Sequence, residues 1–218
     1  MSLWVKICGN TSLEDALLAA DAGADAVGFV FAQSPRQVTP ERVAAITPSL
    51  PAPLEKIGIF VDADSASIAA AIKECGLTGV QLHFSSRDGL SAELRRRFGQ
   101  ELRILQVIHF GEDVGQTLAT AQSNADLDGI LMDSRTATAV GGTGIAFDWQ
   151  AARRAIFQPG SGLKLVAAGG LHPDNVAEAI TTLRPWGVDV VTGVEASPGR
   201  KDAAKVRAFV NAARAAVK

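Results

Sequence analysis

The sequence predicts a single-domain α/β protein, a (β/α)8 TIM barrel of parallel strands that spans residues 1–218. Eight short, nearly continuous apolar runs alternate with amphipathic, alanine-rich segments. Such runs are typical of parallel strands that are covered on both faces. Dividing 218 residues among eight strand–helix units gives about 27 residues for each unit, which suits the short end of this fold's size range. No Gly/Ser-rich or charged linker separates the segments, so one domain is expected.

The strands are expected where the apolar runs lie. These are residues 3–8, 26–31, 56–61, 79–83, 103–109, 128–133, 163–168 and 187–192. The alternative is an open, doubly wound sheet. In its dinucleotide-binding form that sheet needs a glycine-rich turn after the first strand. Cys8-Gly9-Asn10-Thr11 is not such a turn, so the barrel is favoured.

Helix signals fall between these strands. Ser12 is a typical N-cap residue, and Asp15 follows it three positions later. Thr39 followed by Pro40 marks the start of a second helix, because proline is favoured at the first helical position. The other helices are expected at 65–75, where Gly76 ends the helix, and at 88–98, 113–124, 148–156, from Pro173 onward, and 202–217.

Composition narrows the classes of partner. The formal net charge is -2, so neither nucleic acid nor an anionic membrane surface is an expected partner. The two cysteines, Cys8 and Cys75, lie far apart in the sequence and do not suggest a disulfide framework or a metal site. No signal peptide is expected, because Met1-Ser2 leads directly into the first apolar run, and no apolar run is long enough to suggest a bilayer span. A cytoplasmic protein that needs no metal or other cofactor is expected.

Polar side chains stand at the ends of the expected strands. In order along the chain they are Cys8, Arg36, Asp62, His83, His109, Asp133 and Asp189. The carboxyl ends of parallel strands meet at one rim of a barrel, and the chemistry of such barrels lies there. We therefore expect several of these groups to face a common site.

Cys8 is the most informative of them. A free cysteine is often only a small buried apolar residue. At the end of a barrel strand it is also placed to act as a nucleophile or, once ionised, as a base. The other groups on the same rim favour the second interpretation.

Three glycine-bearing loops follow the last three strands. They contain Gly141-Gly142-Thr143-Gly144, Gly169-Gly170 and Thr192-Gly193. Glycines allow backbone N–H groups to approach an anion, although they also serve simply to make tight turns. Phosphate sites of this fold commonly lie after strands seven and eight. We expect a phosphorylated small molecule to be held by the amides of Gly142, Gly144, Gly170 and Gly193, with the Thr192 hydroxyl.

Motifs along almost the whole chain then carry a family resemblance. They include Lys6-Ile7-Cys8-Gly9, Ser34-Pro35-Arg36, Gln81-Leu82-His83, Met132-Asp133-Ser134, Gly141-Gly142-Thr143-Gly144, Gly169-Gly170-Leu171, Gly193-Val194-Glu195 and Pro198-Gly199-Arg200-Lys201-Asp202. In this order the chain resembles phosphoribosylanthranilate isomerases of tryptophan biosynthesis. Two positions depart from the common pattern: Ile145 stands where lysine is frequent, and Val191 where serine is common. Both departures concern individual phosphate contacts.

The resemblance implies an Amadori rearrangement of N-(5-phosphoribosyl)anthranilate to the corresponding deoxyribulose phosphate. It implies Cys8 as general base and Asp133 as general acid. Arg36 is the natural partner for the anthranilate carboxylate, because a guanidinium can bind a carboxylate with two parallel hydrogen bonds. Asp189 and His83 are candidates for binding the sugar, with a purely structural role as the alternative for each.

Two other functions remain open at this stage. One is the related aminoaldose isomerase of histidine biosynthesis, but that enzyme is expected to have an aspartate where Cys8 stands here. The other is a barrel that binds a phosphorylated metabolite without converting it, which the presence of both Cys8 and Asp133 disfavours. The protein is expected to be a monomer or a homodimer. Structural or solvated roles are expected for the remaining candidates: His109, His172, Asp62, Trp4, Trp149, Trp186 and Cys75.

Overall fold

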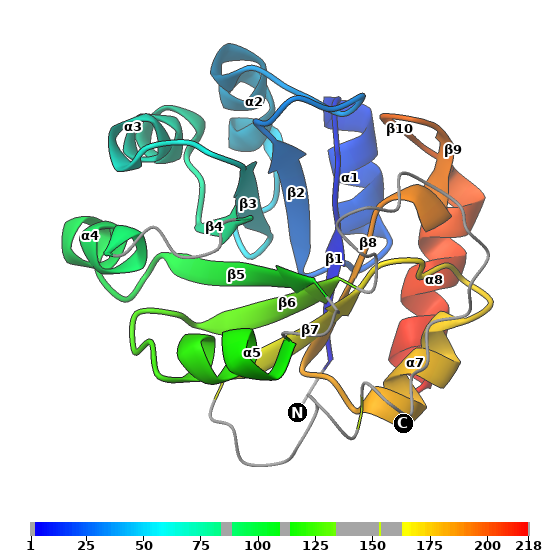
Figure 1. Cartoon of the computed structure of the whole chain (residues 1–218). Helices are drawn as coiled ribbons and strands as arrows, with labels where there is room; N and C mark the ends of the chain where they lie inside the picture. Colours follow the sequence, from blue (N-terminus) through cyan, green and yellow to red (C-terminus); the bar gives the residue numbers. More distant parts are fainter. Residues whose placement is uncertain (1–2, 84–88, 110–113, 134–152, 154–162, 218) are drawn as a thin grey trace.

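The computed structural model is a closed barrel of eight parallel strands, and it confirms the predicted fold (Figure 1). It describes residues 3–83, 89–109, 114–133, 153 and 163–217. The strands are β1 (Trp4–Ile7), β2 (Ala26–Val30), β3 (Glu55–Phe60), β4 (Gly79–Leu82), β5 (Arg103–His109), β6 (Gly129–Asp133), β7 (Lys164–Ala168) and β8 (Gly187–Val190). The pairing of β1 with β8 closes the barrel, with Lys6 beside Asp189 in the register.

The described helices lie outside the ring of strands (Figure 1). They are α1 (Leu13–Asp21), α2 (Pro40–Ile46), α3 (Ser65–Cys75), α4 (Leu90–Phe98), α5 (Val114–Gln122), α7 (Val176–Leu183) and α8 (Ala203–Ala215). The predicted caps are confirmed: the side chains of Ser12 and Thr39 accept hydrogen bonds from the first turns of α1 and α2. Gly76 ends α3 in the left-handed conformation. The helix predicted at 148–156 lies outside the described residues, apart from Arg153.

The predicted start of α7 at Pro173 is wrong, because the helix begins at Val176. The Asn175 carboxamide explains the delay. Its Oδ1 accepts from the backbone N–H of His172 at 2.8 Å, and its Nδ2 donates to the carbonyl of Gly170 at 3.0 Å. Such local side-chain bonds stabilise a turn in competition with the helix.

A short antiparallel hairpin, which the sequence did not predict, follows the last barrel strand. It consists of β9 (Glu195–Ser197) and β10 (Arg200–Lys201), joined by a turn at Pro198 and Gly199. A short 3-10 helix, η2 (Thr192–Val194), connects β8 to it. The hairpin lies beside the end of β1, since Thr11 Oγ1 donates to the carbonyl of Gly199 at 2.7 Å.

The barrel interior changes character along its axis. Near the amino ends of the strands it is apolar, with Trp4 stacked on Trp186 at 5.2 Å between ring centroids. The Arg103 guanidinium lies 5.2 Å from the Trp186 ring. These contacts confirm the packing role predicted for Trp4 and Trp186, while Trp149 lies outside the described residues. Cys75 is fully buried at the end of α3, which confirms its predicted place in the core. Farther along the axis the interior becomes polar.

Among the described helices, none combines the length and apolar character that a membrane span requires.

Candidate active site

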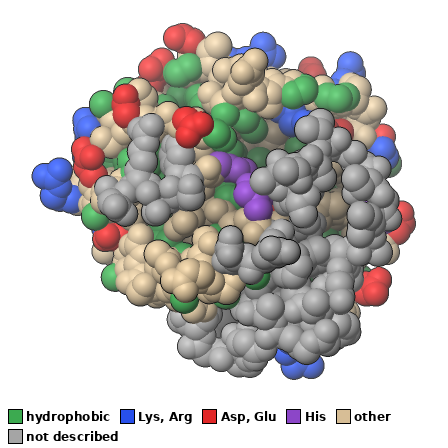
Figure 2. Space-filling model, in the orientation of Figure 1, with side chains coloured by type: hydrophobic (Ala, Val, Ile, Leu, Met, Phe, Trp, Pro, Cys, Tyr) green, Lys and Arg blue, Asp and Glu red, His purple; other side chains and the backbone are tan. Residues whose placement is uncertain are grey.

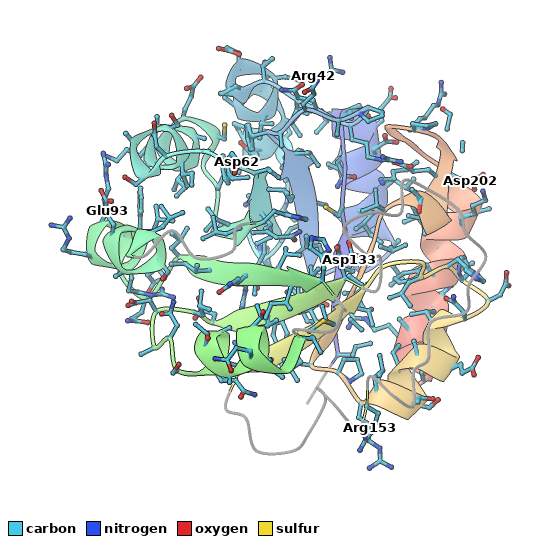
Figure 3. The ribbon with its side chains drawn as sticks, in the orientation of Figure 1. Arg42, Asp62, Glu93, Asp133, Arg153 and Asp202 are labelled. Carbon is cyan, nitrogen blue, oxygen red and sulfur yellow. The ribbon has the colours of Figure 1, made fainter. Side chains whose placement is uncertain are left out.

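The polar end of the barrel is built by alternation along the strands. Successive side chains of a strand point to opposite faces, so Lys6 and Cys8 share the inward face of β1 with Trp4. The same alternation on β8 brings Asp189 inward, next to Lys6. Asp133, at the end of β6, is 4% exposed and lies near the middle of the ring of strands (Figure 3). Figure 2 shows histidine side chains together in the centre of this face.

Cys8 directly follows β1 and is 3% exposed. Its thiol lies against the backbone of β2: a Cβ atom on Gly28 would be 2.6 Å from Cys8 Sγ. Its carbonyl accepts a 2.6 Å hydrogen bond from Lys201 Nζ. Burial raises the pKa of the Cys8 thiol above its ordinary value, and the positive charges of Lys6 and Lys201 oppose that rise while the charge of Asp189 adds to it.

Lys6 is a residue of the site that the sequence analysis quoted only as part of a motif. Its side chain is fully buried, and Nζ donates to Asp189 Oδ1 at 2.8 Å and to Gln81 Oε1 at 2.7 Å. Although burial disfavours the ammonium form, the charges of Asp189 and Cys8 leave the pKa of Lys6 raised. The available signal was a lysine inside an apolar strand, two positions before Cys8.

The chain of contacts continues to His83. Gln81 Nε2 lies 3.1 Å from His83 Nε2. Because the Gln81 oxygen already accepts from Lys6, its NH2 group is the donor, and His83 Nε2 is then the unprotonated nitrogen. The His83 ring lies 6.1 Å from that of His109. His109 is exposed at the end of β5 and pairs in register with Asp133, so this histidine stands on the rim of the site.

Arg36 is held in place by a partner that the sequence analysis missed. Its Nε and Nη2 donate to the two carboxylate oxygens of Glu195 at 2.8 and 2.6 Å. Lys201 Nζ also lies 3.5 Å from Glu195 Oε1. Burial favours the protonated form of Glu195, but its hydrogen bonds to Arg36 and the charge of Lys201 leave its pKa below the ordinary value. One edge of the guanidinium, formed by Nε and Nη2, is thus committed to Glu195.

Of the predicted phosphate-binding residues, Gly170, Thr192 and Gly193 are described, whereas Gly142 and Gly144 lie outside the described residues, as does Ile145. The structure brings two of the three loops into contact. A Cβ atom on Gly193 would lie 1.9 Å from the carbonyl oxygen of Leu171, so only glycine fits there. Gly170 adopts a left-handed conformation with φ of 64°. Val191 packs toward Gly9, where a Cβ atom would meet its Cγ1 at 3.2 Å.

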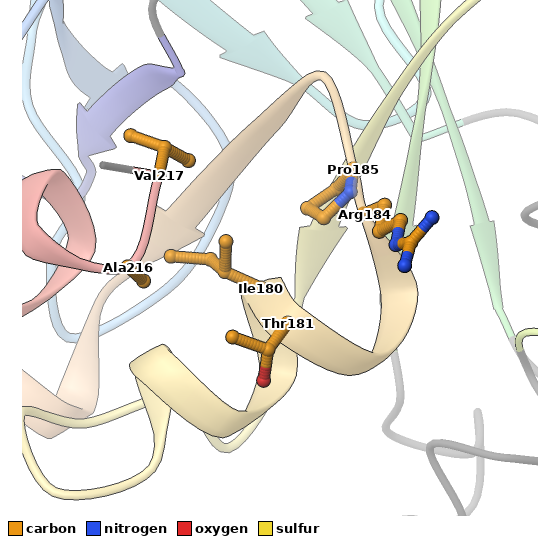
Figure 4. A pocket seen from close by; sticks show the side chains of 6 residues that line it. All are labelled: Ile180, Thr181, Arg184, Pro185, Ala216 and Val217. Atoms are coloured by element: carbon orange, nitrogen blue, oxygen red, sulfur yellow. The ribbon is translucent and has the colours of Figure 1, made fainter.

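The remaining candidates lie apart from this site. His172 is half exposed, 3.6 Å from Asp174, and Asp62 is exposed after β3. Within the described ranges, no group of three His, Cys, Asp or Glu side chains is placed to hold a metal ion. A surface hollow between the ends of α7 and α8 opens near the opposite, amino-terminal end of the barrel (Figure 4). Its lining residues are Ile180, Thr181, Arg184, Pro185, Ala216 and Val217.

Comparison with known proteins gives consistent matches over nearly the whole chain. The family model of N-(5'phosphoribosyl)anthranilate (PRA) isomerase matches residues 5–212. A protein of Pelobacter propionicus named N-(5'-phosphoribosyl)anthranilate isomerase is 43% identical over 211 residues, covering 96% of this chain and 95% of its own. The protein of that name from Geobacter sulfurreducens is 42% identical over 212 residues, covering 96% and 98%.

Solved structures agree with the sequence matches. Phosphoribosyl anthranilate isomerase from Thermotoga maritima is 35% identical with a TM-score of 0.81, covering 98% of this chain and 99% of its own. A phosphoribosyl anthranilate isomerase in complex with reduced 1-(o-carboxyphenylamino)-1-deoxyribulose 5-phosphate is 33% identical with a TM-score of 0.79, with the same coverage.

Proposed function

Because the chain belongs to the N-(5'-phosphoribosyl)anthranilate isomerase family, we propose that Cys8 is the general base and Asp133 the general acid of its reaction. The protein is an isomerase of tryptophan biosynthesis. It converts the aminoaldose N-(5'-phosphoribosyl)anthranilate into the aminoketose 1-(2-carboxyphenylamino)-1-deoxyribulose 5-phosphate. The observation that carries the assignment is that both side chains are buried at the carboxyl ends of barrel strands, β1 and β6, which flank the same mouth.

The rearrangement needs one acid and one base on the two sides of a sugar. Asp133 would donate its proton to the ribose ring oxygen as the C1–O bond breaks, and the anthranilate nitrogen then supplies the electron pair of a C1=N Schiff base. Cys8 in its thiolate form would remove the proton from C2. The electron pair of that C–H bond forms a C1=C2 double bond, and the π pair of the C1=N bond moves back onto nitrogen. The resulting enol takes up a proton at C1 and becomes the product ketone.

The burial of Cys8 sets the working range of the base. Burial raises the pKa of the thiol, so at neutral pH the thiolate is the minor form. A thiolate is the reactive form of cysteine, and below the pKa its fraction grows about tenfold for each unit by which the pH is raised. The contribution of Cys8 to turnover should therefore increase from neutral into alkaline solution.

The other contacts position the substrate. Arg36 would bind the anthranilate carboxylate, with Glu195 holding the guanidinium on its other edge. The phosphate would lie on the amides of Gly170 and Gly193 and the Thr192 hydroxyl, joined by Gly142 and Gly144. His83 and Asp189 are the candidates for binding the sugar hydroxyls, and both already have partners inside the barrel: Asp189 Oδ1 accepts from Lys6 and His83 Nε2 lies 3.1 Å from Gln81 Nε2. No residue in this scheme calls on a cofactor.

A cytoplasmic location belongs to the same proposal, as does a monomeric or dimeric state. One solved relative at 34% identity is described as monomers made from a dimeric phosphoribosylanthranilate isomerase of Thermotoga maritima. Analytical ultracentrifugation of this chain distinguishes the two states.

The decisive experiment follows turnover by anthranilate fluorescence beside a product-binding titration. The wild type, Cys8→Ser and Asp133→Asn are compared, with Cys75→Ser as a matched control because Cys75 is also buried but lies on α3. Turnover lost in the first two variants, with product binding retained, supports the assignment. Near wild-type turnover in Cys8→Ser would refute the base. The same enzyme is also tested with the aminoaldose of histidine biosynthesis, for which no turnover is expected.

A further inference from the structure

Lys6 occupies a position that lysine rarely takes in a folded protein. Its side chain is fully buried inside the barrel, whereas buried lysines are seldom found unless paired. The structure pairs it twice: with Asp189 on β8 and with Gln81 on β4, at 2.8 and 2.7 Å. Three strands thus converge on one ammonium group beneath the mouth.

A structural brace alone does not account for this arrangement. Buried ion pairs add little net stability, because the cost of desolvating both charges offsets their attraction, and apolar residues of similar size often replace them without loss. Here the lysine also stands two residues before Cys8, the proposed base. By the alternation of side chains, Lys6 on β1 and Cys8 directly after it point to the same inward face, and the positive charge of Lys6 favours the ionised form of the thiol.

We propose that Lys6 is a positioning residue for the isomerisation: held by Asp189 and Gln81, its ammonium group supplies the positive charge beneath Cys8 that makes the thiolate accessible. The inference rests on the proposed role of Cys8 as the base. It adds the source of the charge that a buried thiolate requires, since an isolated buried anion is strongly disfavoured.

Lys201 and Asp189 are the other charged groups that influence the Cys8 thiol. Lys201, from β10, donates to the Cys8 carbonyl and also lies next to Glu195, whose charge opposes its own. Asp189 disfavours the thiolate, and Gly28 of β2 brings no charge. Lys6 is the largest of the influences that favour ionisation of the Cys8 thiol. The same ammonium fixes the Gln81 carboxamide and through it the His83 ring.

The test measures the pH dependence of Cys8 alkylation by iodoacetamide, with the alkylated peptides quantified by mass spectrometry so that Cys75 is counted separately. Lys6→Met should move the inflection of Cys8 alkylation to higher pH by at least one unit, which lowers the alkylation rate about tenfold at a fixed pH below the inflection. The double variant Lys6→Met/Asp189→Asn should shift it less, because it also removes the charge that disfavours the thiolate. Lys164→Met, a lysine at the other end of the barrel over Trp186, should leave it unchanged.

An unchanged inflection in Lys6→Met and in the double variant would overturn the proposal, and so would an equal shift in Lys164→Met. If Lys6→Met does not fold because Asp189 is left unpaired, the double variant, which leaves no buried charge from the pair, decides the question. Alkylation reports ionisation whether or not Cys8 is the base, whereas turnover of Cys8→Ser tests the base itself. Failure of the two proposals is therefore distinguishable.

Discussion

At the scale of single residues, the candidate site depends on the pKa and the packing of the Cys8 thiol. The same burial that protects Cys8 from solvent raises its pKa, and the neighbouring ammonium groups of Lys6 and Lys201 work in the opposite direction. The position of the thiol also depends on Gly28, because Cys8 Sγ occupies the space that a side chain at position 28 would fill. Charge and space around one sulfur atom are thus both determined by its neighbours.

Cys8→Ser should lower kcat by about 10²–10⁴-fold, the usual contribution of a general base. A serine hydroxyl is a much weaker base than a thiolate at any accessible pH.

In the wild type, kcat should increase with pH through neutrality, because the pKa of Cys8 is raised and its active form is the deprotonated one. A stopped assay from pH 6 to 10 measures both this increase and the loss in Cys8→Ser. A wild-type rate that is already at its plateau at pH 6 would contradict the expected ionisation.

Asp133→Asn should be as damaging as the loss of Cys8, by a different route. Asparagine keeps the shape and a hydrogen bond but has no proton to give to the ring oxygen, so the sugar ring stays closed. The free energy of unfolding should change little, because a polar residue on the active rim serves the site and not the core. Steady-state kinetics with urea unfolding as the control checks both. Retained turnover would make His83 or a bound water the donor.

Gly28→Ala should displace the thiol and reduce kcat. The added Cβ atom would lie 2.6 Å from Cys8 Sγ and 3.0 Å from Ile59 Cδ1, so the neighbours must shift. Overpacking of this kind costs about 1–3 kcal/mol of unfolding free energy. Gly115→Ala is the matched control, since its Cβ atom meets nothing within 4 Å on α5. Equal activity of the two variants would show that the thiol has room to move.

At the scale of elements, the hairpin of β9 and β10 connects the last strand to the first half of the barrel. Glu195 on β9 binds Arg36 after β2, and Lys201 on β10 donates to the carbonyl of Cys8 after β1. The hairpin therefore positions both the proposed carboxylate-binding group and the backbone of the proposed base. Such a short element is stabilised by these contacts because isolated two-stranded hairpins are marginal in water.

Glu195→Gln should raise KM more than it lowers kcat, because Arg36 loses the carboxylate that orients it. Removing a charged hydrogen-bond partner should also cost about 1–3 kcal/mol of stability at neutral pH. Folding lowers the pKa of Glu195, so its carboxylate stabilises the fold above the unfolded-state pKa and this contribution is lost as pH falls through the lowered, folded-state pKa. Thermal unfolding across pH should show the wild type and the variant converging in acid. A constant difference would argue against this ion pair.

At the scale of the whole molecule, the two ends of the barrel differ: the packed apolar core lies at one end and the candidate active site at the other. Inside the barrel, the amino-terminal end is filled by stacked tryptophans and apolar side chains, and the buried Lys6, Asp189 and Asp133 side chains lie farther toward the carboxyl-terminal end. The tight contact between Gly193 and Leu171 joins the loops after β7 and β8 at the latter end.

A crystal soaked with inorganic phosphate should show the anion at the loops after β7 and β8, against Gly170, Thr192 and Gly193. Backbone amides at converging glycine loops bind a dianion without lysine. The hollow near Arg184, at the opposite end of the barrel, is the internal comparison (Figure 4). Density in that hollow alone would contradict the placement.

Much of this fold was determined by local sequence. Each barrel strand begins and ends within two residues of the predicted run. A parallel strand that is buried on both faces consists of nearly continuous apolar residues, so it can be located from the sequence. The caps Ser12 and Thr39 could also be predicted from local sequence, because the side chain of a cap accepts a hydrogen bond from a backbone N–H only three residues away. The positions of Cys8 and Asp133 at strand ends could be predicted because they follow from where the apolar runs stop.

Only the tertiary structure decided which side chains meet. Arg36 and Glu195 are 159 residues apart, Lys6 and Asp189 are 183 apart, and Lys201 and Cys8 are 193 apart. Local periodicity records which face of a strand is buried, but it carries no record of the partner across the barrel. Lys6 appeared only as a motif residue inside an apolar run because its partners lie on β4 and β8, and closure of the barrel is what brings these strands to it.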